Sequence, residues 1–166
     1  MAKPFLLLQS RPGNEEADNE YEAFLKKGGL DSRKLQRVRI EKYGVPDIRF
    51  DEYAGIFVGG GPSNASDPYE KKSDAQKIFE PQLLKLIDRI VEKDIPFLGV
   101  CYGIGLVGTG QGGVISDKYK EIPGIIPITL TDHGKKDRLV KSMPTTFSAI
   151  TGHKESCEVL PPAAVL

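Results

Sequence analysis

Cys101 is the residue best placed for nucleophilic chemistry, because it ends an apolar run and stands among glycines. Residues 97–105 read FLGVCYGIG. This pattern predicts a buried strand, a sharp turn at the cysteine and a helix that begins directly after it. A helix N-terminus favours thiolate over thiol, so the turn would both expose and activate the sulfur. The alternative is a buried core cysteine whose neighbouring glycines serve only tight packing.

A second apolar segment also runs into glycines, since residues 54–63 read AGIFVGGGPS. In an open parallel sheet, sites form outside the carboxyl ends of the strands, so we expect both turns to meet at one crevice. A backbone amide of the Gly59–Gly61 turn and the amide of Tyr102 would then bind the oxyanion of a tetrahedral intermediate. The two turns therefore predict acyl transfer. The alternatives are an ordinary loop and a phosphate-binding loop, but the GxxxxGK[ST] pattern is absent and no helix follows at once.

These segments resemble the class I glutamine amidotransferases, in particular stand-alone members similar to the glutaminase domain of GMP synthase. The resemblance covers most of the chain. The motifs that carry it are GGGP at 59–62, GVCYG at 99–103, GG at 112–113, GHKE at 152–155 and LPP at 160–162.

The resemblance implies a flavodoxin-like, three-layer α/β fold with a mostly parallel central sheet. It also implies that Cys101 attacks the side-chain amide of glutamine, releases ammonia and leaves a glutamyl thioester for water to hydrolyse. By the same match, Gly61 and Tyr102 supply the oxyanion-hole amides, with Gly60 as the neighbouring candidate. No cofactor is implied. The ammonia acceptor would be a separate synthetase subunit, unless the protein is a free-standing hydrolase.

The chain departs from the family pattern in two places. The family reads C-x-G-hydrophobic-Q at the nucleophile and uses that glutamine side chain to hold the substrate, whereas position 105 is glycine. The family's catalytic His-x-Glu motif stands well beyond the LPP segment, whereas this chain stops at Leu166. We therefore expect residues 1–166 to be a single glutamine amidotransferase-like domain with its C-terminal part missing.

His153 and Glu155 form a His-x-Glu of their own. Their context, GHKE before LPP, resembles an earlier histidine of the family that lies at the edge of the sheet, separate from the catalytic pair. Two interpretations follow: a base and its orienting carboxylate, or hydrogen-bonded residues that support the site. The base interpretation requires His153 within hydrogen-bond reach of Cys101, and spacing along the chain does not fix that distance.

Composition narrows the partners to small molecules. Lys plus Arg and Asp plus Glu each total 23, which gives no basic field for nucleic acid and fits neutral small-molecule substrates best. Two cysteines without a secretory signal indicate free thiols in a reducing, cytoplasmic compartment. The FLLL segment at 5–8 is too short for a membrane span. Cys101 and Cys157 lack zinc-site spacing, so we predict no metal.

Hydrophobic periodicity by itself predicts an α/β fold, because short apolar strands alternate with amphipathic helices. The Ser73-Asp74-Ala75-Gln76 sequence predicts a capping box, and Pro81 predicts a kink or a later helix start. The polar stretch 63–72 predicts a connector beside the crevice, either a lid or a plain solvated loop. We expect strands at 4–9, 35–41, 54–58, 97–100, 113–116, 125–131 and 147–151, and helices at 15–27 and 73–93.

Two other functions stay open. Because position 105 lacks the family's glutamine, the chain is also compatible with a cysteine hydrolase or peptidase of related fold that acts on another substrate. Without the family's C-terminal His-x-Glu motif, the chain is also compatible with a catalytically incomplete scaffold or a module that binds a partner.

Overall fold

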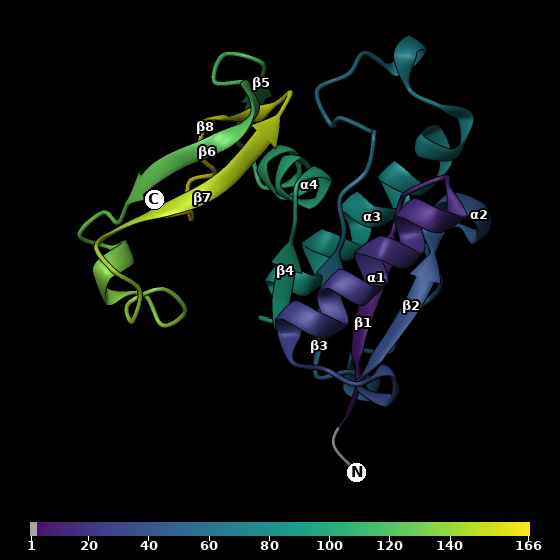
Figure 1. Ribbon diagram of the computed structural model, residues 1–166. Helices are drawn as coiled ribbons and strands as arrows, with labels where there is room; N and C mark the ends of the chain where they lie inside the picture. Colours follow the sequence, from purple (N-terminus) through teal and green to yellow (C-terminus); the bar gives the residue numbers. More distant parts are fainter. Residues whose placement is uncertain (1–2) are drawn as a thin grey trace.

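Four parallel strands form the central sheet, in the order β2-β1-β3-β4 (Figure 1). The computed structural model describes residues 3–166. β1 and β3 are buried at the centre, which explains their near-continuous apolar sequences. The strands of this sheet are β1 (Phe5–Gln9), β2 (Leu35–Arg39), β3 (Gly55–Val58) and β4 (Phe97–Gly99).

Helices cover both faces of the sheet, giving the three-layer, flavodoxin-like α/β fold that the sequence predicts (Figure 1). On one face, the Phe57 ring stacks on Phe5 at 5.1 Å and on Phe24 of α1 at 5.3 Å between centroids. The other face packs against the remaining helices through a core that includes Leu6, Leu83 and Leu106. The helices are α1 (Asn14–Gly28), α2 (Ile40–Tyr43), α3 (Asp74–Glu92) and α4 (Tyr102–Gly110).

The last third of the chain forms two small antiparallel sheets beside α4 (Figure 1). One pairs β5 (Val114–Ser116) with β8 (Ser156–Val159), and the other pairs β6 (Glu121–Thr129) with β7 (Thr146–His153). β8 has no counterpart among the expected strands. No helix within residues 3–166 has the length and apolar character needed to cross a membrane.

Two expectations about the elements need correction. The strand expected over 35–41 ends at Arg39, because Ile40 turns into the core as the first residue of α2. The long helix starts at Asp74 and continues through Pro81, so the proline does not mark its beginning. Ser73 accepts a hydrogen bond from the Gln76 amide at 3.1 Å, as a cap should.

The reciprocal half of the expected capping box is absent, since the Gln76 side chain is used elsewhere. Its amide nitrogen donates to the Asn64 carbonyl at 3.0 Å and to Glu80 at 2.8 Å. Gln76 is only 2% exposed. This side chain therefore fixes the connector that follows β3 instead of the helix start.

Candidate active site

Cys101 occupies a strained turn, called the elbow below, between β4 and α4, the elbow helix, and its thiol is exposed. Its backbone angles are φ 55° and ψ −105°, a conformation that non-glycine residues adopt at a cost and that often marks a functional position. The flanking glycines make the turn possible. A Cβ added to Gly99 would lie 2.8 Å from the Gly103 carbonyl, and one added to Gly103 would lie 3.0 Å from the Val58 oxygen.

The glycine turn after β3 lies against the cysteine. A Cβ added to Gly60 would stand 3.1 Å from Cys101 Cβ and 3.5 Å from its Sγ. The Gly60 amide donates to Glu20 Oε1 at 2.9 Å and is therefore already used. Within residues 3–166, the amides of Gly61 and Tyr102 have no hydrogen-bond partner. Two of the three candidate oxyanion donors thus remain available.

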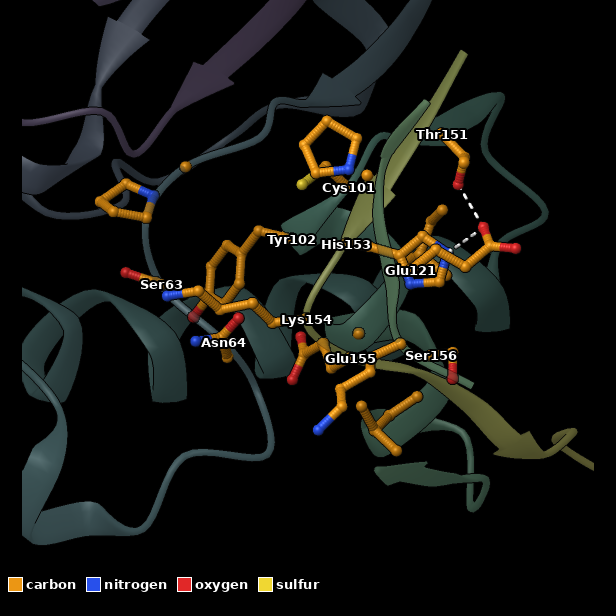
Figure 2. A pocket seen from close by; sticks show the side chains of 18 of the residues that line it. Ser63, Asn64, Cys101, Tyr102, Glu121, Thr151, His153, Lys154, Glu155 and Ser156 are labelled. Carbon is orange, nitrogen blue, oxygen red and sulfur yellow. Dashed lines mark hydrogen bonds and ion pairs between the residues drawn. The ribbon is translucent and has the colours of Figure 1, made fainter. Parts of the chain in front are cut away.

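A cavity of about 920 Å³ opens beside Cys101 and extends between the central sheet and the small sheets. Figure 2 shows the labelled side chains that line it, from the turn at Cys101 and the start of α4, the connector after β3, strands β6 to β8 and the turn between β7 and β8. The structure therefore brings Cys101, Gly61, Tyr102, His153 and Glu155 to one cavity.

His153 pairs with a carboxylate that the sequence analysis did not single out. Its Nε2 lies 3.0 Å from Glu121 Oε2, while its Nδ1 is buried without a hydrogen-bond partner among the described residues. The Thr151 hydroxyl also donates to Glu121, and Thr151 together with His153 holds the pKa of that carboxyl below its ordinary value. Neither ring nitrogen of His153 is hydrogen-bonded to Cys101 Sγ.

Glu155 is not paired with His153, because its carboxylate holds the connector after β3. It accepts hydrogen bonds from the Ala65 amide at 2.9 Å, the Ser66 amide at 2.8 Å and the Ser66 hydroxyl at 2.7 Å. A Cβ added to Gly105 would overlap Glu155 Oε1. The Glu155 carboxylate thus lies next to the position at which the family pattern carries its glutamine.

The Tyr102 side chain anchors the elbow helix to α3. Its hydroxyl donates to Glu80 Oε2 at 2.6 Å, and the ring is only 1% exposed. Burial, followed by the Glu80 carboxylate, raises the pKa of Tyr102 well above its ordinary value. Lys72 forms an ion pair with the same carboxylate. The Tyr102 phenol is therefore committed to the contact with α3, whereas its backbone amide has no partner among the described residues.

Three polar residues near the glycine turn were missed by sequence reasoning. Glu20 accepts hydrogen bonds from Gln9, Arg11 and the Gly60 amide. One Arg11 guanidinium nitrogen would lie 3.1 Å from a Cβ on Gly60, on the glycine that also faces Cys101. Ser10 and Arg11 follow directly after β1. Because sites form at the carboxyl ends of parallel strands, their position in the sequence could have identified both as site residues. No comparable sequence signal points to Glu20, which lies within α1.

Comparison with known families agrees with this architecture. The family model described as glutamine amidotransferase class-I matches residues 20–165, so the chain belongs to this family. Among curated relatives, GMP synthase [glutamine-hydrolyzing] from Borrelia garinii subsp. bavariensis is 28% identical over 138 residues, which cover 80% of this chain. The chain spans about a quarter of that relative's length, since the match covers 23% of it.

Solved structures share the fold. A glutamine amidotransferase from Thermotoga maritima superimposes with a TM-score of 0.72 at 19% identity, covering 99% of this chain and 66% of that one. A glutamine amido transferase from Methylobacillus flagellatus gives a TM-score of 0.71 at 20% identity, covering 99% of this chain and 60% of that one. The parallel-sheet architecture is therefore common to all three.

Proposed function

We propose that this chain carries the nucleophilic half of a glutamine amidotransferase site and cleaves the side-chain amide of glutamine at Cys101. The observation that carries the proposal is the exposed Cys101 thiol on a positive-φ turn at the edge of a cavity, beside the Gly61 and Tyr102 amides, which have no partner within residues 3–166. Membership of the class I family supports glutamine as the substrate.

In the proposed reaction, the Cys101 thiolate attacks the amide carbon and the carbonyl electron pair moves onto oxygen. The amides of Gly61 and Tyr102 donate to this oxyanion as it forms. Collapse of the intermediate breaks the carbon–nitrogen bond, the departing nitrogen takes up a proton from solvent water and leaves as ammonia, and a γ-glutamyl thioester stays on the sulfur. Water then hydrolyses the thioester to glutamate.

His153 and Glu155 are proposed to support the cavity wall. His153 faces Glu121 with one nitrogen and buries the other, and Glu155 fixes the connector at Ala65 and Ser66. A general base must instead lie within hydrogen-bond reach of the nucleophile. We therefore expect His153→Asn to leave covalent capture at Cys101 intact.

The ammonia is proposed to pass to a separate acceptor subunit, in the reducing cytoplasm where free thiols persist. The Borrelia relative, named as a glutamine-hydrolyzing GMP synthase, is about four times as long as the matched segment, so an acceptor module fits the remaining length of such proteins.

The test is intact mass spectrometry after treatment with 6-diazo-5-oxo-norleucine, an electrophile that mimics glutamine. We expect a single adduct on the wild type and on Cys157→Ala, and none on Cys101→Ala. Excess glutamine should slow the labelling and excess asparagine should not. Labelling that glutamine does not slow would contradict the proposed substrate.

A second candidate function follows from the Glu155 carboxylate next to Gly105. A carboxylate in place of a neutral amide would favour a substrate other than glutamine, which corresponds to a cysteine hydrolase of related fold. Acylation of Cys101 by p-nitrophenyl acetate, without labelling by the glutamine mimic, would favour this alternative. Reaction with neither reagent would indicate a module that binds a partner without catalysis.

A further inference from the structure

Two side chains hold both polar groups of Gly60. The Gly60 amide donates to Glu20 Oε1 at 2.9 Å, and the Gly60 carbonyl accepts from Ser10 Oγ at 3.2 Å. Ser10 is 3% exposed, and the Glu20 side chain is 9% exposed. Glu20 is itself fixed by Arg11 and Gln9. Gly60, which faces Cys101, is therefore held by hydrogen bonds to side chains that follow β1 and belong to α1.

The hydrogen bond from Ser10 also determines where the next amide points. The Gly60 carbonyl and the Gly61 N–H belong to one planar trans peptide, so they point in opposite directions. β3 lies between β1, which Ser10 follows, and β4, which leads to Cys101. With the carbonyl directed toward Ser10, the Gly61 N–H is directed to the Cys101 side.

Rotation of this peptide would reverse both directions and point a carbonyl oxygen toward the oxyanion. Glycine on both sides of the peptide offers little steric resistance to such a rotation. Ser10 opposes it, because rotation would leave its buried hydroxyl without an acceptor. A Cβ on Gly61 would lie 2.6 Å from Ser10 Oγ, so the hydroxyl is in close contact with this residue too.

We propose that Ser10 is a positioning residue of this site, which holds the Gly60–Gly61 peptide in the orientation that presents the Gly61 amide to the oxyanion. The inference rests on the proposed nucleophilic role of Cys101, but it does not depend on glutamine as the substrate.

The test compares two reactions of the same sulfur. In acylation by p-nitrophenyl acetate, the thiolate adds to the ester carbonyl, the oxygen becomes an oxyanion, and the carbon–oxygen bond breaks to release p-nitrophenolate. In alkylation by iodoacetamide, the sulfur displaces iodide and no oxyanion forms. Both adducts are followed by intact mass, with the Cys101→Ala reaction subtracted.

Ser10→Ala should slow acylation about tenfold or more, up to the roughly 10²–10³-fold loss that follows when an oxyanion donor is removed outright. Alkylation should stay within about twofold of wild type, because it needs no oxyanion donor. Ser10→Thr keeps the hydroxyl and should restore most of the acylation rate. Ser116→Ala removes a hydroxyl that bonds Glu158 and the Lys118 amide but not the glycine turn, and it serves as the matched control.

An equal loss of acylation and alkylation in Ser10→Ala would overturn the inference, because it would indicate a general structural defect. Unchanged acylation would also overturn it, and so would a wild type that the ester does not acylate. If the glutamine mimic fails to label while acylation still depends on Ser10, the substrate proposal fails and the role of Ser10 stands.

Discussion

At the scale of single residues, the site depends on how closely backbone groups approach the cysteine. A side chain would clash at three glycines around the cysteine. A Cβ on Gly99 would meet Gly103, one on Gly103 would meet Val58, and one on Gly60 would meet Cys101. Cys101 is held at a positive φ by this packing, which keeps its thiol at the edge of the cavity. Small changes in the shape of the turn should therefore alter reactivity more than stability.

Gly60→Ala tests this dependence directly. Its new methyl would stand 3.1 Å from Cys101 Cβ and 3.5 Å from Sγ, which is tight enough to displace the thiol or the turn. We expect acylation by p-nitrophenyl acetate to fall roughly 10- to 100-fold, since misplacement by about 1 Å can cost this much. Gly124→Ala, with no atom nearer than 3.8 Å to the added Cβ, should keep the wild-type rate. A Gly60→Ala protein as reactive as wild type would refute the prediction.

At the scale of elements, the connector after β3 is tied to both halves of the chain and does not behave as a plain solvated loop. Glu155, between β7 and β8, holds it at Ala65 and Ser66, while Gln76 of α3 holds it at Asn64. Lys72 at its far end donates to the Ala65 carbonyl at 3.2 Å. The connector thereby links the Gly59–Gly61 turn to the wall of the cavity.

Glu155→Ala should release this connector. Because two backbone amides lose their acceptor, we expect hydrogen exchange over residues 64–67 to accelerate about tenfold, which corresponds to the net value of one or two hydrogen bonds. Hydrogen-exchange mass spectrometry on overlapping peptides measures the effect. Glu158→Ala, which removes a carboxylate bonded to Ser116 and Lys118, is the control and should leave the connector unchanged. Equal exchange in both variants would show that the connector is held by α3 alone.

At the scale of the whole molecule, the buried core and the cavity wall come from different parts of the chain. The fully buried apolar residues end with Leu106, so strands β5 to β8 contribute none of them. These strands are joined instead by ladder hydrogen bonds and by polar contacts, such as those of Glu121 with Thr151 and His153. The wall should therefore respond to pH more strongly than the core.

The lowered pKa of Glu121 determines in which direction stability changes with pH. Its pKa is lowered in the folded state from an ordinary value of 4.5, so its stabilising effect is present above that pH and is lost as pH falls through the folded pKa. Urea unfolding followed by circular dichroism between about pH 6 and pH 3 should show a lower midpoint for Glu121→Gln at pH 6, and a shallower fall on acidification. Glu22→Gln, at an exposed position of α1, should parallel the wild type. Parallel curves for Glu121→Gln and wild type would contradict the assignment.

The sequence by itself determined the elements of the central sheet and the position of the elbow. Periodicity and glycine spacing are local properties, which is why the β1 strand, the α1 helix and the turn at Cys101 follow from neighbouring residues alone. The cap at Ser73 could also be predicted from the local sequence, because it joins residues only three positions apart.

Only the tertiary structure decided which distant side chains meet at the site. Glu155 bonds an amide 90 positions away, His153 meets Glu121 across 32 positions, and Ser10 reaches Gly60 across 50. Such pairs depend on how strands cross over and on the register of β6 with β7, which no local pattern records. A carboxylate takes whichever donors the fold brings to it, so the partners of Glu155, Glu121 and Glu20 emerge only when the layers pack together.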